Sequence, residues 1–186
     1  MDMNPNFVMF TFINLISIVL SIYFFFRVFE VNFNNLIVSR SYFYIEPFLS
    51  PFRLFLPVIY RFDLSCLALI FFFKSLGIYI LLTGLEKDFL LNDCLLLAAT
   101  EILLSFNEIL RYSLLISIIG SWAFPNSHNY FLSLCNSITN VLLKPFQSFT
   151  ITEGTDFSPI IVFILIYLID RILIRLQIFL ELPGLN

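Results

Sequence analysis

Four long apolar stretches constrain this chain more than any other feature of its sequence. They cover residues 7–29, 64–84, 91–119 and 157–180. A transmembrane helix needs about 20 predominantly apolar residues, and each stretch is long enough. The chain is 60% hydrophobic and only 12% charged, whereas soluble domains carry about 25% charged residues. The sequence therefore predicts an all-α integral membrane protein with four transmembrane helices.

The spacing of the four stretches indicates an internal repeat. Long connections, residues 30–63 and 120–156, follow the first and third stretches, whereas a short polar turn separates the second from the third. Asp63 and Asp156, at the ends of the long connections, are 93 residues apart, half the chain length. We therefore divide a single membrane domain into two two-helix repeats, residues 1–90 and 91–186. Because each repeat crosses the membrane twice, the repeats are expected to be parallel rather than inverted.

The basic residues predict how the protein is oriented in the membrane. Lys and Arg near helix ends favour the cytoplasmic side. Five basic residues lie in or beside the long connections and two lie on the opposite side: Arg27, Arg40, Arg53, Arg61 and Lys144 against Lys87 and Arg175. This bias predicts cytoplasmic long connections and external termini. The first residues, MDMNPN, lack the basic region of a signal peptide, so the first apolar stretch is expected to stay in the membrane.

The first long connection contains an unusual segment, PFLSPFRLFLPVIYRFDLSC, at residues 47–66. It is too apolar for a water-exposed loop, and its prolines are expected to divide any helix into short pieces. We expect it to lie flat in the membrane interface, with Phe48, Phe52 and Phe55 on lipid or helix edges and Arg53 at the headgroups. Its role is either to guide the chain into the next helix or to form a lipid- or protein-recognition surface. The second connection carries a weaker copy, and the motif residues of the two copies are Pro47, Pro51, Phe52, Arg53, Pro57, Asp63 and Ser65, then Pro145, Phe146, Asp156, Ser158 and Pro159.

Each copy ends in an Asp-x-Ser sequence at the start of an apolar stretch. Ser158 at the N-cap and Pro159 at the first helical position would form a favourable helix start. Asp63 and Asp156 would favour the positive end of the helix dipole. The sequence therefore predicts helix capping, and the alternative is a functional carboxylate pair with one member in each repeat.

Six charged residues fall inside the apolar stretches: Lys74, Glu101, Glu108, Arg111, Asp170 and Arg171. Charges in the membrane are costly and are usually paired or functional. From their depths we expect Lys74 to meet Glu108 or Asp170, and Arg171 to meet Glu101. Arg111 is expected near the interface. Helical spacing places Glu101, Ser105, Glu108 and Arg111 on one stripe, which is predicted to face inward as an ion-pair network or as an ion or proton path.

The two motif copies resemble those of the YggT family, small bacterial inner-membrane proteins whose proteobacterial members are tandems of two two-helix units. The first copy reads Pro47-Phe48-Leu49-Ser50-Pro51-Phe52-Arg53, then Pro57 and Asp63-Leu64-Ser65; the second reads Lys144-Pro145-Phe146-Gln147, then Asp156-Phe157-Ser158-Pro159. Ser121-Trp122 is also similar to the family pattern. Gln147 replaces the motif arginine, and Cys66 replaces a proline. The resemblance implies a bacterial inner-membrane location and links to osmotic tolerance, division or cytochrome assembly, and it supplies no catalytic residues.

Enzymatic chemistry is not predicted. The chain has one histidine, five glycines and three cysteines without close spacing, so no metal site, cofactor or nucleophile–base pair is indicated. The net charge of −3 does not favour nucleic-acid binding. We expect a non-enzymatic membrane assembly or scaffold factor, linked through the resemblance to envelope or osmotic homeostasis, whose partners are the lipid bilayer and another membrane protein or a homo-oligomer. The alternative is an oligomeric ion channel or transporter component.

Overall fold

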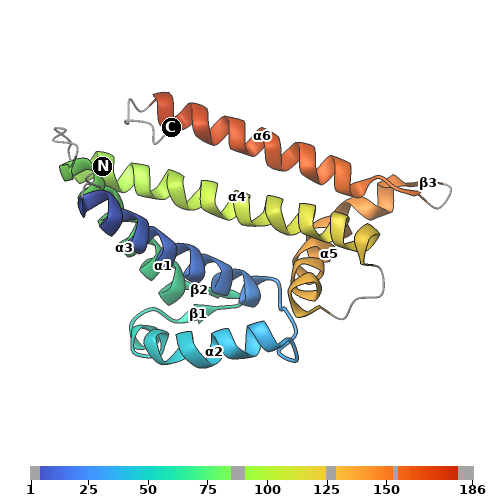
Figure 1. Cartoon of the computed structure of the whole chain (residues 1–186), viewed down its shortest axis with the longest axis horizontal. Helices are drawn as coiled ribbons and strands as arrows, with labels where there is room; N and C mark the ends of the chain where they lie inside the picture. The colour runs from blue at the N-terminus through green and yellow to red at the C-terminus, as the bar shows by residue number, and fades with distance from the viewer. Residues whose placement is uncertain (1–4, 85–90, 125–128, 153–154, 180–186) are drawn as a thin grey trace.

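A computed structural model of the chain describes residues 5–84, 91–124, 129–152 and 155–179, with side chains described outside 148–156 and 179. These residues form six α-helices, one 3₁₀ turn and two short hairpins (Figure 1). The prediction of an all-helical protein is confirmed for the described residues.

Four helices are long: α1 (Pro5–Val28), α3 (Leu64–Gly84), α4 (Leu91–Ala123) and α6 (Ser158–Phe179). The predicted boundaries agree with these helices to within a few residues. Among the described residues, α1, α3 and α4 are long and apolar enough to cross a membrane. Helix α6 carries three charged residues, Asp170, Arg171 and Arg175, within its 22 residues, whereas α4 carries four within 33.

The long connections contain helices that the sequence did not predict. Helix α2 (Leu36–Leu49) and the 3₁₀ turn η1 (Phe52–Leu54) fill the first connection, and α5 (Tyr130–Thr150) fills most of the second. Within residues 47–66 the chain is divided into short pieces, as expected: α2 ends at Leu49, and η1 and a two-residue strand, Val58–Ile59, follow. Pro47 lies in the last turn of α2 and Pro145 lies inside α5, where each lacks the N–H that a helix hydrogen bond needs.

A small antiparallel hairpin precedes both α3 and α6. Strands β1 (Val58–Ile59) and β2 (Phe62–Asp63) pair with Val58 opposite Asp63. Strands β3 (Ile151–Thr152) and β4 (Thr155–Asp156) pair with Ile151 opposite Asp156. Apart from η1, both halves of the chain therefore have the same order of described elements, and their hairpins have the same register.

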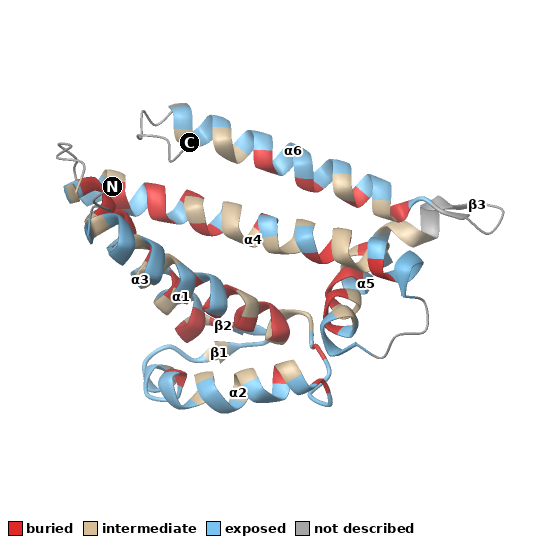
Figure 2. Cartoon of the chain, viewed as in Figure 1, coloured by how far each residue is buried: buried red, intermediate tan, exposed pale blue. Residues whose placement is uncertain are grey.

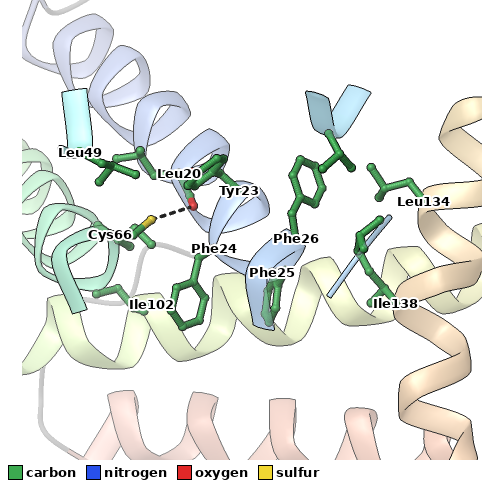
Figure 3. Packing of buried hydrophobic residues seen from close by; sticks show 13 residues of the cluster. Leu20, Tyr23, Phe24, Phe25, Phe26, Leu49, Cys66, Ile102, Leu134 and Ile138 are labelled. Carbon is green, nitrogen blue, oxygen red and sulfur yellow. Dashed lines mark hydrogen bonds between the residues drawn. The ribbon is translucent and has the colours of Figure 1, made fainter. Parts of the chain in front are cut away.

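The four long helices pack along one another, and α2 and α5 lie near the same end of the set (Figure 1). Gly84 at the end of α3 lies against Asn6 at the start of α1, so these two helices are antiparallel. The central core forms around Leu20, Tyr23 and Phe24–Phe26 of α1 (Figure 3). Phe24 and Phe25 pack on Phe106 of α4, with ring centroids 5.5 and 5.0 Å away. This core joins the two halves of the chain.

The outward faces of the long helices remain apolar. Figure 2 shows exposed residues along most of α6 and along the outer face of α1. They include large side chains such as Phe12, 67% exposed, and Ile172, 66% exposed. Water disfavours so much exposed apolar surface, whereas lipid does not. The surface is therefore typical of a membrane protein.

Candidate functional site

The buried carboxylate of Asp63 organises the first motif copy. Its Oδ2 atom accepts hydrogen bonds from Nη1 of Arg27 at 2.7 Å, and from Nη2 and Nε of Arg53 at 2.5 and 3.1 Å. Its Oδ1 atom accepts from the backbone N–H of Cys66 at 3.2 Å. That N–H is in the first turn of α3, so the predicted capping role of Asp63 is confirmed. One carboxylate thus caps α3 and joins α1 to η1.

Glu46 on α2 completes this arrangement. Its Oε1 atom pairs with Nη1 of Arg53, and its Oε2 atom accepts a hydrogen bond from the hydroxyl of Tyr23 at 2.8 Å. Arg27 also donates to the hydroxyl of Tyr42 through Nη2, at 3.3 Å. We call the whole set the Asp63 cluster, which consists of Tyr23, Arg27, Tyr42, Glu46, Arg53 and Asp63. Its two arginines balance its two carboxylates.

Hydrogen bonds within the Asp63 cluster favour the charged states of Glu46 and Arg53. Burial alone would raise the pKa of Glu46, but hydrogen bonds from Arg53 and Tyr23 outweigh it and hold that pKa below its ordinary value. Burial alone would lower the pKa of Arg53, but hydrogen bonds to Glu46 and Asp63 raise it instead. The cluster therefore fixes α2, η1 and the first hairpin against α1 through charged hydrogen bonds.

The position of Arg53 differs from the sequence prediction. We expected it at the lipid headgroups, yet its side chain is only 17% exposed and points to Glu46 and Asp63. The expected aromatic residues do face outward: Phe48, Phe52 and Phe55 are all exposed. The arginine thus holds the segment from inside, because the buried carboxylate of Asp63 and the partly buried carboxylate of Glu46 both attract it.

The remaining motif residues of the first copy shape its backbone. Pro47, Pro51 and Pro57 are exposed, in α2, before η1 and before β1 respectively. Ser65 is fully buried, and its hydroxyl donates to the backbone carbonyl of Leu56 at 2.6 Å. This hydrogen bond ties the first turn of α3 to the chain that leaves η1.

The second copy is built differently. Pro145 is exposed, and Phe146 packs partly buried against the cluster around Leu114 and Leu143. Ser158 was predicted at the N-cap of α6, but it is buried and is the first helical residue of that helix. Pro159 follows it as the second helical residue. The side chain of Asp156 lies outside the described residues, and so does the predicted carboxylate pair.

Lys74 lies at the meeting point of several long helices. Its Nζ atom donates to Oδ1 of Asn14 on α1 at 2.7 Å and lies 3.8 Å from Oε2 of Glu101 on α4. Gln177 on α6 donates to Oε1 of the same glutamate at 3.0 Å. The predicted pairing of Lys74 with Glu108 or Asp170 is wrong. It failed because depth along a helix does not give the direction in which a side chain points.

A second group of polar side chains joins α4 to α6. Arg111 pairs with Oδ2 of Asp170, and Asn107 donates to Oδ1 of Asp170 at 2.6 Å and to the carbonyl of Ile166 at 2.8 Å. Arg111 is therefore engaged with α6, a contact that the sequence did not predict, and its expected place near the interface stays a prediction. Glu108 is 3.7 Å from Arg111, with its side chain 54% exposed.

Arg171 and the polar stripe of α4 also differ from the sequence predictions. Arg171 donates to the hydroxyl of Tyr167 at 2.9 Å and stacks over its ring, so it does not meet Glu101. Of the stripe predicted to face inward, Glu101 is 21% exposed in its side chain and contacts α3 and α6, whereas Glu108 faces outward. The inward position is taken by Asn107, only 5% exposed.

Sequence reasoning did not select several of the residues that make these polar contacts. Arg27 was counted only for membrane orientation, and the other missed residues are Asn14, Tyr23, Tyr42, Glu46, Asn107 and Gln177. One signal was available for Glu46. It lies seven residues before Arg53, within reach once residues 36–49 form a helix.

The similarity to a known protein family lies in the second half of the chain, which contains α4, α5, the β3–β4 hairpin and α6. Residues 96–177 match the CCB3/YggT family model. The predicted resemblance to the YggT family is confirmed over this segment.

The chain is also 38% identical over 71 residues to an uncharacterized protein of Pseudomonas aeruginosa. This match covers 38% of the chain and 36% of the relative, so it spans about a third of the relative's length. No solved structure is significantly similar to the chain.

The described side chains form no constellation that suggests catalysis. Among them, no group of three or more His, Cys, Asp or Glu residues could hold a metal ion. The three cysteines, Cys66, Cys94 and Cys135, are buried and free. The charged groups instead contact one another across helices, which is an arrangement that stabilises a structure.

Proposed function

We propose that the protein is a non-enzymatic, multi-pass protein of the bacterial inner membrane that serves as an assembly scaffold. The observation that carries this proposal is the outward aromatic face above the Asp63 cluster. The segment made of α2, η1 and the β1–β2 hairpin, which we call the α2 platform, has the charges of Glu46, Arg53 and Asp63 paired on its inner side. Its outward face carries large apolar and aromatic side chains: Phe43, Tyr44, Phe48, Leu54, Phe55 and Tyr60.

Four membrane crossings form part of this proposal, with α1 and α3 in one repeat and α4 and α6 in the other. The charges of α6 do not exclude a crossing, because Asp170 is paired with Arg111 and Asn107, and Arg171 stacks on Tyr167. The common order of elements and the equal hairpin registers support two parallel repeats, residues 1–90 and 91–186.

Reporter fusions test this topology. A reporter inserted at Ser137 in α5 should lie on the cytoplasmic side, and one fused after Asn186 should lie outside. Reporters on the same side would contradict an even number of crossings per repeat. Exchanged sides would contradict only the orientation that the basic residues predict.

The scaffold role follows from the rigidity and the surface of the α2 platform. Charged hydrogen bonds fix its backbone, so little conformational entropy is lost when a partner binds. Aromatic side chains are enriched both at protein interfaces and at the membrane interface. We propose that the α2 platform lies at the cytoplasmic membrane surface and contacts another membrane protein there.

Site-specific photocrosslinking in intact membranes tests the scaffold role. A photoreactive residue at Phe48 should give an adduct of discrete protein mass, and Arg53→Gln, which frees the platform, should reduce its yield. The matched control is Ile164 on α6, which is 52% exposed and should give lipid adducts. Lipid adducts alone at Phe48 would refute the scaffold role, and an adduct of twice the chain mass would identify a homo-oligomer.

A second candidate function is an oligomeric ion channel or transporter component. It is favoured by the polar contacts of Lys74 with Asn14 and Glu101, which reach Gln177 and so involve all four long helices. Purified protein in vesicles should then carry an ion flux that Lys74→Gln abolishes. A flux equal to that of empty vesicles would exclude this candidate.

A further inference from the structure

A cavity of about 610 Å³ lies where the end of α1 meets α2 and the β1–β2 hairpin. These elements come together in the lower part of Figure 1. Small-molecule sites typically have volumes of 300–1,000 Å³ and combine apolar walls with a few polar groups. The apolar walls here are Phe26, Val31, Phe33 and Val38. The cavity is therefore of the size and character of a ligand site.

The polar wall is dominated by two arginines. Arg27 and Arg61 both line the cavity, together with the hydroxyl-bearing Tyr42 and one carboxylate, that of Glu30. Oε1 of Glu30 lies 2.7 Å from Nε of Arg61, and their side chains are 61% and 49% exposed. Exposed ion pairs contribute little free energy, so an incoming anion can displace this carboxylate. The carboxylate of Glu30 thus marks a position where an anion contacts Arg61.

The backbone around the cavity is strained at two points. Among the described residues, Glu30 and Tyr60 are the non-glycine residues with positive φ, at 49° and 61°. Both line the cavity. L-residues with side chains rarely adopt this conformation, and such strain is concentrated at functional sites. The turn at the end of α1 and the β1–β2 loop, each with one such residue, place Glu30 and Tyr60 at the cavity.

We propose that this cavity binds a phosphate-bearing anion, with the phosphate held by Arg61 in place of the Glu30 carboxylate and with Arg27, which also pairs with Asp63, beside it. Guanidinium groups match phosphate oxygens through paired charged hydrogen bonds. The apolar walls fit the glycerol and upper acyl carbons of a phospholipid, and exposed Phe33 and Tyr60 lie at the rim. This site shares Tyr60 with the outward face of the α2 platform, but its anion contact is made by Arg61, so its proposal does not depend on a protein partner.

Native mass spectrometry of the full-length protein in mild detergent tests the proposal. We expect the protein to retain phosphatidylglycerol in preference to phosphatidylcholine. Arg61→Gln removes a charged hydrogen bond and should weaken retention about tenfold. Glu30→Gln removes the competing carboxylate and should strengthen it. The matched control is Arg40→Gln, because Arg40 is an exposed basic residue of α2 that does not line the cavity.

The outcomes separate a specific site from general charge attraction. Equal retention of both lipids, or equal losses in Arg61→Gln and Arg40→Gln, would overturn the proposal. Unchanged retention in Glu30→Gln, together with unchanged retention in Arg61→Gln, would do the same. Competition with inorganic phosphate identifies the source: displacement of the lipid would show that free phosphate occupies the site, whereas continued retention would show that the site takes the lipid headgroup.

Discussion

Replacing Asp63 by asparagine should destabilise the protein more than any other single amide substitution of a described carboxylate. The side chain of Asp63 is 1% exposed, and its carboxylate pairs with Arg27 and Arg53. Removing one member of a buried ion pair costs about 3–5 kcal/mol, because the partner charge is left buried. The two arginines are 27% and 17% exposed, and Arg53 keeps its contact with Glu46. We therefore expect a loss of about 3 kcal/mol, at the lower end of this range.

The helix cap can be separated from the ion pairs. Asparagine preserves the Oδ1 acceptor for the backbone N–H of Cys66, whereas alanine does not. Loss of an N-cap acceptor costs about 1 kcal/mol. Asp63→Ala should therefore lower the free energy of unfolding by about 1 kcal/mol more than Asp63→Asn.

The measurement is detergent-driven unfolding of purified protein in mixed micelles, followed by circular dichroism. Glu30→Gln is the control, because it removes the same charge from an exposed pair with Arg61 and should change stability by less than about 1 kcal/mol. A double-mutant cycle with Arg53→Gln should give a coupling energy of at least about 1 kcal/mol. If Asp63→Asn costs no more than Glu30→Gln, the Asp63 cluster does not stabilise the fold and our reasoning about the motif is wrong.

Three further predictions concern single contacts. Charge reversal at Lys74 should prevent stable insertion, and Glu101→Lys should restore expression whereas Glu108→Lys should not, because Glu101 lies beside Lys74 and Glu108 lies beside Arg111. Tyr60→Gly should raise the unfolding temperature, by about 0.5–1 kcal/mol in free energy, because the first position of a two-residue hairpin loop with positive φ favours glycine; an unchanged temperature would show that the turn is not strained. The pKa of Glu46 is lowered in the folded state, so its contribution should be complete above the ordinary value of 4.5 and lost as the pH falls through the lowered pKa. The difference in stability between wild type and Glu46→Gln should accordingly shrink only in acid, and a difference that grows in acid would contradict the sign of this shift.

The sequence predicted the long helices well because one property determines them. Apolar stretches of membrane-crossing length give the positions of α1, α3, α4 and α6, and Leu64–Gly84 agrees with the predicted boundaries. Helices α2 and α5 were missed because the connections were searched for apolar stretches of membrane-crossing length, and these two helices are not such stretches.

The sequence identified several residues of the candidate site but not the contacts between them. The motif residues Arg53 and Asp63 were both selected, yet their ion pair was not, since the first was assigned to lipid and the second to capping. Likewise, Lys74 and Glu101 were both selected but given other partners. A linear sequence gives the depth of each charge, but pairing also depends on the rotation of each helix about its axis, which packing of the aromatic core around Phe24 and Phe106 determines.

The polar contacts between helices show why the two halves depend on one another. Asn14 of α1 and Asn107 of α4 are 93 residues apart, the same separation as Asp63 and Asp156. Asn14 accepts a hydrogen bond from Lys74, whereas Asn107 donates one to Asp170. An amide can serve partners of either charge, because it carries both an acceptor and donors.

The balancing charges, however, both come from one helix. On α4, Glu101 lies beside Lys74 of α3, and Arg111 pairs with Asp170 of α6. The antiparallel helices α1 and α3 therefore bury the positive charge of Lys74. Among the described contacts, the carboxylate beside it, Glu101, comes from the second half of the chain. An unpaired lysine at mid-membrane costs about 2.5–3.5 kcal/mol on insertion scales. Helix α4, in the second half, thus supplies the negative charge that makes burial of Lys74 in the first half tolerable.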